Sequence, residues 1–421
     1  MASPNSIPSP DDSLTQGGTT TNVDTPVTPN PSETLPQGSS YDISSQLTLI
    51  ITTSPTPSAP STSLLSQILS SFRAFCPPLL HCPVILILDT YDHISTTARL
   101  KKGHVTAEGA KKYALYKENA KALILREWSL EGKEGDLLEE EGQAEYGSVA
   151  YAQHGNPVVK LRISRTRDGK VTFVEPEQRL GFGLAVREGL RLARTEYVWV
   201  QQHDWSLVAQ IPVGEVLEVM RRQSDAADEH ELTGVENTEP TTKVPVKYVC
   251  FPSVRMLRYA RSDHVMLFPA LRALTNLHKQ TFTVRDSTKN VQHKIPLTPL
   301  FFWHDKPHIA EKLHYLARVF PNRSAVPRGA FIEDTVGHRA RDEMKEGQWR
   351  KWACWLYYPD EGKQLCLRHL KGRTWRGAEG ELERKMELIR INQENGIPKR
   401  DGKSQVEWEY IWSEEETLCG D

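Results

Sequence analysis

Apolar residues in the first half of the chain predict two buried strands joined by a helix. The runs Leu47–Thr53 and Val84–Leu88 are apolar and rich in β-branched residues, which is typical of strands buried on both faces. Between them, residues 64–75 place apolar side chains at helical spacing, and Pro77 and Pro78 end that pattern. A strand, a helix and a strand within about 40 residues predict a parallel pair with a right-handed crossover.

Further along the chain, the same patterns predict a second unit of this kind. Residues 105–128 are helical in pattern, and strands at 158–163 and 171–174 would pair across the turn at Asp168-Gly169. A narrow apolar stripe over 183–193 predicts a helix that leads into a strand at 197–200. The segment 129–147 is acidic and contains several glycines, and 223–243 is polar, so both are predicted to be surface insertions.

Polar residues follow three of these strands at their carboxyl ends. Thr53 and Ser54 end the first strand, Asp89 follows the second, and the triplet Gln-His-Asp at 202–204 follows the strand at 197–200. In open parallel sheets, ligands bind beyond the carboxyl ends of the strands. The sequence therefore predicts one binding site that combines these residues.

Composition changes this picture at the N-terminus. Residues 1–46 hold nine Ser, seven Thr, seven Pro and five acidic residues, with no Lys or Arg. Such a segment cannot bury enough apolar surface to offset its ordering entropy, so we expect a disordered tail. The whole chain of 421 residues has 52 basic and 54 acidic side chains, a net charge of −2, and the part after residue 46 has a net charge of +3. A near-neutral body is not typical of a nucleic-acid-binding protein.

The sequence also argues against a membrane span and a disulfide framework. No apolar run approaches the roughly 18 residues that a spanning helix needs, and the first residues lack the basic start and apolar core of a signal peptide. We therefore expect a cytoplasmic protein. The six cysteines are scattered and form no Cys-x-x-Cys pair, which is typical of reduced thiols.

The order of these motifs resembles that of nucleotide-diphospho-sugar transferases with a GT-A fold, and of glycosyltransferase family 2-like proteins in particular. The matching pieces are residues 49–55, 85–89 and 183–204. The resemblance implies an α/β fold, a mostly parallel open sheet flanked by helices. It divides the chain into the disordered tail 1–46, a glycosyltransferase-like domain 47–375 with surface insertions near 129–147 and 223–243, and a charged C-terminal extension 376–421.

The resemblance also implies roles for the residues at the strand ends. Thr53, Ser54 and Asp89 would bind the nucleotide sugar, together with Asp204. In the family an Asp-x-Asp turn holds a divalent ion against the diphosphate, and here Gln-His-Asp takes its place, so Asp204 and His203 are the candidate ligands of Mn²⁺ or Mg²⁺. The alternative is structural, with both side chains bonded to a neighbouring loop.

An inverting transferase also needs a general base for the acceptor hydroxyl. The family often supplies it from a Glu-Asp pair, which Glu333 and Asp334 resemble. Two adjacent carboxylates repel, which raises the pKa of one of them; the alternative is an acidic pair in the first turn of a helix. Trp303 and His304 are candidate acceptor-side residues, and Asp305 is expected to cap a helix over 308–319.

The leading hypothesis is a glycosyltransferase-like enzyme that binds a nucleotide-diphosphate sugar, a UDP-sugar, and transfers the sugar to an acceptor that the sequence does not identify. The alternative is a catalytically weakened scaffold of the same fold that binds a ligand or a protein partner, because Gln202 stands where the family has a carboxylate.

Overall fold

The computed structural model describes residues 42–130, 136–147, 157–233, 244–286, 291–375 and 377–394. Among these residues, eleven strands form one mixed sheet in the order β11-β12-β14-β10-β13-β8-β1-β2-β7-β6-β5. The strands are β1 (Leu47–Thr53), β2 (Val84–Leu88), β5 (Leu138–Glu145), β6 (Val158–Arg165), β7 (Val171–Pro176), β8 (Tyr197–Gln202), β10 (Tyr248–Cys250), β11 (Gln280–Asp286), β12 (Val291–Pro299), β13 (His308–Glu311) and β14 (Cys354–Tyr357).

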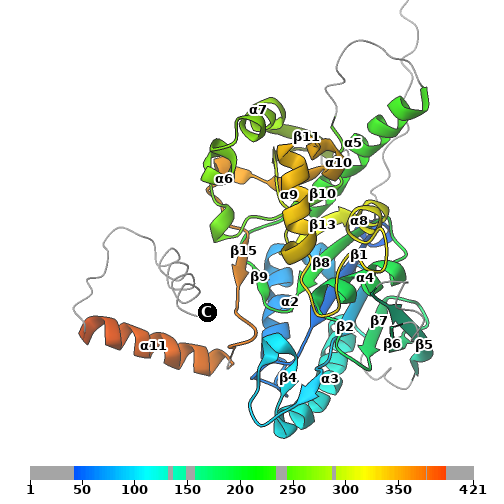
Figure 1. Cartoon of the computed structure of the whole chain (residues 1–421), viewed down its shortest axis with the longest axis vertical. Coiled ribbons are helices and arrows are strands. Elements are labelled where there is room, and N and C mark those ends of the chain that lie inside the picture. Colours follow the sequence, from blue (N-terminus) through cyan, green and yellow to red (C-terminus); the bar gives the residue numbers. More distant parts are fainter. Residues whose placement is uncertain are drawn as a thin grey trace, which may run out of the picture. The chain divides into compact units, whose positions relative to one another are not determined.

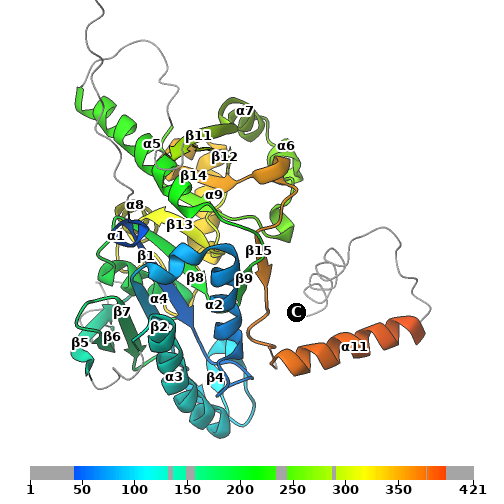
Figure 2. The same cartoon turned by 180° about the vertical axis from the view of Figure 1, so that it is seen from behind.

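Helices flank this sheet, and two short ribbons lie beside it (Figures 1 and 2). The helices are α1 (Ile43–Gln46), α2 (Ser63–Phe75), α3 (Ala107–Glu127), α4 (Phe182–Leu192), α5 (Val213–Thr233), α6 (Asp263–Met266), α7 (Pro269–His278), α8 (Lys312–Val319), α9 (His338–Lys345), α10 (Trp349–Trp352) and α11 (Ala378–Glu394). One ribbon pairs β3 (His93–Ile94) with β4 (His104–Val105), and the other pairs β9 (Trp205–Leu207) with β15 (Leu367–His369).

The centre of the sheet is a parallel block in the order β8-β1-β2-β7. Every residue of β1 and β2 is buried, as their continuous apolar sequences predict. Helix α2 connects β1 to β2, whereas α4 connects β7 to β8 in the opposite direction along the sheet. Because both crossovers are right-handed, the two helices cover opposite faces. Helix α4 packs closely, since a Cβ at Gly189 would lie 2.6 Å from Ile50 Cγ2.

The α/β architecture predicted from the sequence is confirmed, and most early elements lie within a residue or two of their expected bounds. The acidic segment at 129–147 differs from the prediction, because Leu138–Glu145 forms the edge strand β5, paired antiparallel with β6. Helix α5 continues to Thr233, so the polar segment at 223–243 is helical in its first half, and residues 234–243 lie outside the described residues. The predicted tail lies outside them up to residue 41, and its last residues form α1.

The helix expected over 308–319 begins only at Lys312. Residues His308–Glu311 instead form β13, which pairs antiparallel with both β8 and β10. The N-cap of α8 is therefore Glu311, and the prediction that Asp305 caps this helix is wrong. Pairing with two neighbouring strands outweighs the local helical pattern.

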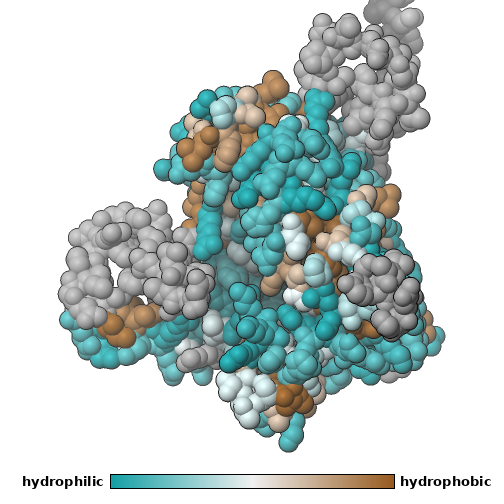
Figure 3. Space-filling view, in the orientation of Figure 1, coloured by the Kyte–Doolittle hydropathy of each residue, from teal (hydrophilic) through white to brown (hydrophobic). Residues whose placement is uncertain are grey.

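The outer surface is largely hydrophilic in the view of Figure 3, with hydrophobic side chains gathered over α6 and α7, where Met266, Leu267 and Leu277 are exposed. None of the described helices is both long and apolar enough to cross a lipid bilayer. The five cysteines within the described residues are all buried and free of disulfides.

Candidate functional site

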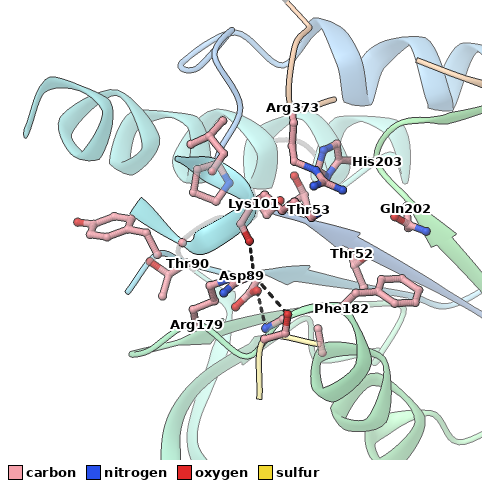
Figure 4. A pocket seen from close by; sticks show the side chains of 18 of the residues that line it. Thr52, Thr53, Asp89, Thr90, Lys101, Arg179, Phe182, Gln202, His203 and Arg373 are labelled. Atoms are coloured by element: carbon pink, nitrogen blue, oxygen red, sulfur yellow. Dashed lines mark hydrogen bonds between the residues drawn. The ribbon is translucent and has the colours of Figure 1, made fainter. Parts of the chain in front are cut away.

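A cleft lies beyond the carboxyl ends of β1, β2 and β8, and it encloses about 810 Å³ when its open mouth is included (Figure 4). Six of the residues singled out in the sequence line it, namely Thr53, Ser54, Asp89, Gln202, His203 and Asp204. The parallel block produces this arrangement, because Thr53 pairs with Leu88 and Thr52 pairs with Gln202. The sequence prediction that these strand ends meet in one place is therefore confirmed, whereas the ligands that they bind stay predictions.

The end of β1 forms the floor of the cleft. Thr53 is 1% exposed, and its Oγ1 lies 2.7 Å from the hydroxyl of Tyr116 on α3. Ser54 is half-buried and lines the cleft directly after it. The hydroxyl of Thr53 is thus held by the fold, which leaves Ser54 as the more accessible hydroxyl of the pair.

Asp89 holds the loop that begins α4. Its Oδ1 accepts a hydrogen bond from the Leu180 N–H at 2.7 Å, and its Oδ2 accepts one from the Gly181 N–H at 2.9 Å (Figure 4). Burial raises the pKa of Asp89 to about 6, although the two backbone donors act in the opposite direction. Each carboxylate oxygen has a second lone pair, so Asp89 can position this wall of the cleft and still accept one more donor.

One wall of the cleft carries a network of basic side chains. The Arg179 guanidinium donates to Asp92 Oδ2 at 3.4 Å and to the carbonyls of Lys101 and Gly329 at 3.2 and 3.3 Å. Arg328 donates to Asp92 Oδ1 at 2.6 Å. The side chain of Lys101 is exposed at the edge of this wall. Arg179 is therefore fixed by several bonds, whereas Lys101 is accessible.

The opposite wall is built around Asp204. Its Oδ2 lies 3.1 Å from His369 Nε2 and accepts the Gly372 N–H at 3.1 Å, whereas its buried Oδ1 has no hydrogen-bond partner within the described residues. Burial alone would raise the pKa of Asp204, but the charge of His369 and its hydrogen bond outweigh this and hold the pKa well below its usual range. Asp204 is therefore an ionised carboxylate with one oxygen free.

His203 and Gln202 occupy the space between this wall and the neighbouring loop. Burial lowers the pKa of His203, so its imidazole is neutral at pH 7, and its Nε2 faces Gly372. Gln202, which stands in the place of a family carboxylate, donates from Nε2 to the carbonyl of Asp305 at 2.8 Å. The amide thus fastens the loop that carries His304.

The family resemblance implies a divalent ion beside Asp204, and the donor atoms permit a test. The unpartnered Oδ1 of Asp204 and the imidazole of His203 are ligands that suit Mn²⁺, whereas His369 Nε2 already pairs with Asp204 Oδ2. The described part of the chain brings together no group of three or more His, Cys, Asp or Glu side chains able to hold a metal. The residues therefore fit an ion only as a partial site, in which substrate oxygens or water complete the coordination.

The predicted base, the pair Glu333 and Asp334, lies at the start of the π-helical turn Glu333–Gly337, directly before α9. This is the position that the alternative of an acidic first turn expects, whereas the role of the pair as a base stays a prediction. Glu333 Oε2 accepts the Asp305 N–H at 3.2 Å and lies 3.4 Å from His304 Nδ1. Asp334 is exposed and forms no hydrogen bond or ion pair with other described residues.

The pKa values of this cluster differ from the expectation that repulsion raises one of the adjacent pair. Burial alone would raise the pKa of Glu333, but the hydrogen bond and charge of His304 lower it to about 2. The strongly raised pKa belongs instead to Asp305, which is 4% exposed, because of its burial and the neighbouring charge of Glu333. Burial lowers the pKa of His304 to about 4, so its ring is neutral at pH 7.

The structure buries Trp303 in the core. Its side chain is 0% exposed and packs against Tyr248 and Tyr315, with ring centroids 4.4 and 4.8 Å apart. A ring with no exposed face cannot stack on a substrate, so the prediction of an acceptor-side role does not fit Trp303. His304 keeps a partly exposed side chain beside Glu333.

The sequence patterns do not predict four residues of the site, namely Lys101, Arg179, His369 and Arg373. Lys101 and Arg179 lie in loops without periodic patterns, although Arg179 directly precedes the helix unit that was identified. His369 is 165 positions from Asp204, and Arg373 is 169 positions from it. The basic character of the segment around them was the only available signal.

Comparisons with known proteins give only distant likenesses. Neither a family model nor a curated protein sequence matches this chain. A mannosyltransferase from Pyrobaculum calidifontis, solved with GDP-Man and Mn²⁺, aligns over 86% of this chain at 13% identity and a TM-score of 0.33, and this chain spans only 66% of its length. Glucosyl-3-phosphoglycerate synthase from Mycobacterium tuberculosis, solved with Mn²⁺, UDP-glucose and phosphoglyceric acid, aligns over 87% of this chain and 86% of its own, at 13% identity and a TM-score of 0.28. These likenesses are too weak to assign a family, so the function has to be argued from the cleft.

Proposed function

We propose that this protein is a glycosyltransferase that binds a nucleotide-diphosphate sugar, a UDP-sugar, in the cleft and transfers the sugar to an acceptor of unknown identity. The observation that carries the proposal is the convergence of Thr53, Ser54, Asp89 and Asp204 in one cleft beyond the carboxyl ends of parallel strands. Such a position is where open α/β sheets bind ligands, and hydroxyls with carboxylates suit a ribose and a base edge.

In this proposal the nucleoside lies at the ends of β1 and β2. Ser54 offers a hydroxyl, and Asp89 offers the second lone pair of each carboxylate oxygen. Thr53 shapes the floor through its bond to Tyr116. The diphosphate then extends towards Asp204, between walls that carry Lys101 and Arg179 on one side. These cations favour a ligand that carries negative charge.

Asp204 and His203 would hold a divalent ion, Mn²⁺ or Mg²⁺, with His369 bonded to the second oxygen of Asp204. When bound, such an ion neutralises the charge of a diphosphate leaving group. The ionised state of Asp204 and the neutral ring of His203 are the protonation states that a cation site needs.

On the acceptor side, Asp334 accepts the proton of the attacking hydroxyl, because it is exposed and has no bond to other described residues that would have to break. Glu333 fixes the start of this turn through Asp305 and His304. Although burial alone would raise it, the pKa of Glu333 is lowered by the hydrogen bond and charge of His304, which makes Glu333 a weak base.

A second candidate function is a scaffold of this fold that binds a nucleotide sugar without transferring it. Gln202 favours it, since its amide is already bonded to the Asp305 carbonyl and offers no carboxylate to an ion. The two candidates predict the same binding and differ in turnover.

Isothermal titration of the full chain with UDP, with and without Mn²⁺, tests the binding. We expect binding that Mn²⁺ strengthens, and its absence under both conditions would refute both candidates. Release of UDP from UDP-sugars in the presence of sugar, lipid and protein acceptors then distinguishes them. Release that depends on an acceptor supports the transferase, whereas binding without release across a broad acceptor panel supports the scaffold.

A further inference from the structure

The segment from Leu367 to Trp375, here called the strap, forms the wall of the cleft nearest Asp204. Its first three residues are β15, which pairs antiparallel with β9, so that His369 lies opposite Trp205. The Leu370 N–H donates to the Asp204 carbonyl at 2.7 Å, and Trp375 Nε1 donates to Ser63 Oγ at 3.3 Å. The strap is thus fastened at both ends to the elements that surround the cleft.

The turn in the middle of the strap lies unusually close to His203 and Asp204. A Cβ at Gly372 would lie 2.7 Å from His203 Nε2 and 3.0 Å from Asp204 Cβ. Only a residue without a side chain permits this approach, and the Gly372 N–H uses it to bond Asp204 Oδ2. The backbone directly before residue 373 is therefore held in place by the Asp204 carboxylate.

Arg373 extends from this turn into the cleft, beside His203 and across from Arg179 (Figure 4). Its side chain is exposed, and its guanidinium carbon lies 5.6 Å from the centre of the Phe331 ring. Within the described residues it pairs with no carboxylate. Stacking on an aromatic ring orients a guanidinium while leaving its N–H donors unused.

Arg373 differs in this respect from Arg179 on the facing wall. Arg179 donates hydrogen bonds to Asp92 and to two backbone carbonyls, so its guanidinium is a fixed part of the wall. Arg373 retains its donors for a ligand, and a guanidinium fork matches the geometry of phosphate oxygens. The near-neutral charge of the whole chain means that an anion must be held by such local groups.

We propose that Arg373 binds the diphosphate of the nucleotide sugar, and that the strap positions Arg373 for this contact. The proposal rests on the proposed function, because it assumes that a nucleoside diphosphate occupies this cleft. Arg373 would distinguish a nucleoside diphosphate from the nucleoside alone, whereas Ser54 and Asp89 would contact the part that both ligands share.

The test is isothermal titration of the full-length protein with UDP, GDP, uridine and guanosine, for wild type and for Arg373→Ala, Arg373→Lys and Arg368→Ala. Arg368 lies on the same strap, and because side chains alternate along a strand it points away from the face that carries His369, so it is the matched control. Thermal unfolding of each variant checks that the fold is intact.

We expect Arg373→Ala to weaken binding of the diphosphate by roughly 10- to 100-fold, since a hydrogen bond to a charged group has about that effect on affinity. Binding of the nucleoside should not change, Arg373→Lys should recover part of the loss, and Arg368→Ala should match wild type. Equal binding of the diphosphate by wild type and Arg373→Ala would overturn the inference and leave the proposed function standing. If wild type binds neither diphosphate, both are overturned.

Discussion

Replacing Asp204 by Asn or by Ala separates its structural contacts from its charge. In the wild type, Oδ2 accepts hydrogen bonds from His369 and Gly372, both at 3.1 Å, and Oδ1 has no partner within the described residues. Asparagine can place its carbonyl at the position of Oδ2 and its amide at that of Oδ1, so both hydrogen bonds persist while the charge is lost. Alanine removes the charge and both bonds.

The expected costs follow from these contacts. A hydrogen bond to a charged group contributes about 1.5–3 kcal/mol and a neutral one about 0.5–1.5 kcal/mol. Asp204→Ala should therefore lower the free energy of unfolding by roughly 3 kcal/mol or more, because it also leaves the Gly372 N–H without its acceptor. Asp204→Asn should cost roughly 2–3 kcal/mol, because it exchanges two charged bonds for neutral ones that are each about 1–1.5 kcal/mol weaker.

Both variants should lose the strengthening of UDP binding by Mn²⁺, because neither has a carboxylate oxygen for the ion. Urea unfolding at pH 8 measures the stability, and titration with UDP with and without Mn²⁺ measures the ion effect. Equal stability of the two variants would refute the assignment of the hydrogen bonds. An unchanged Mn²⁺ effect in Asp204→Asn would refute the ion site.

Three further predictions concern other parts of the molecule. Glu175 is 4% exposed, accepts a hydrogen bond from Lys117 at 2.8 Å and pairs with Lys121 at 2.5 Å. Burial alone would raise the pKa of Glu175, but these two lysines lower it to about 2. Glu175→Gln should thus cost about 3 kcal/mol at pH 7, and because the folded pKa is depressed, the difference in urea unfolding should be full above about pH 4.5 and vanish as the pH falls towards 2. Gly372→Ala should weaken UDP binding and change the melting temperature little, because the new Cβ would displace the His203 side chain. Equal UDP affinity of the wild type and Gly372→Ala would contradict the close approach. Asp334→Asn should keep UDP binding and slow sugar transfer by roughly 10²- to 10⁴-fold, and a transfer rate like that of wild type would assign the base elsewhere.

The sequence was sufficient for the parallel block because its strands are continuous apolar runs. Continuous apolar runs are typical of strands that are buried on both faces, and the polar residues directly after them lie at the edge of the cleft. For this reason Thr53, Asp89 and Asp204 could be placed together before any contact between them was known. The pairing of β1 with β2 then follows from the short crossover through α2.

The parts that could not be predicted depend on contacts between distant segments. Residues 308–311 have a helical pattern locally, yet they form a strand because β8 and β10 lie on either side. Trp303 has the aromatic character of a binding residue, and only the packing of Tyr248 and Tyr315 around it shows that it belongs to the core. Local sequence carries no information about such neighbours.

The strap also has a consequence for how the protein is made. The strands that end in the cleft are complete once residue 204 has been translated, but the wall that contains His369 and Arg373 is added from residues 367–375. A ribosome-bound chain that has folded only its first half therefore presents an open half-site that contains Lys101 and Arg179 but lacks His369 and Arg373. If the proposed function holds, the complete contact with a diphosphate forms only when synthesis of the chain is nearly finished.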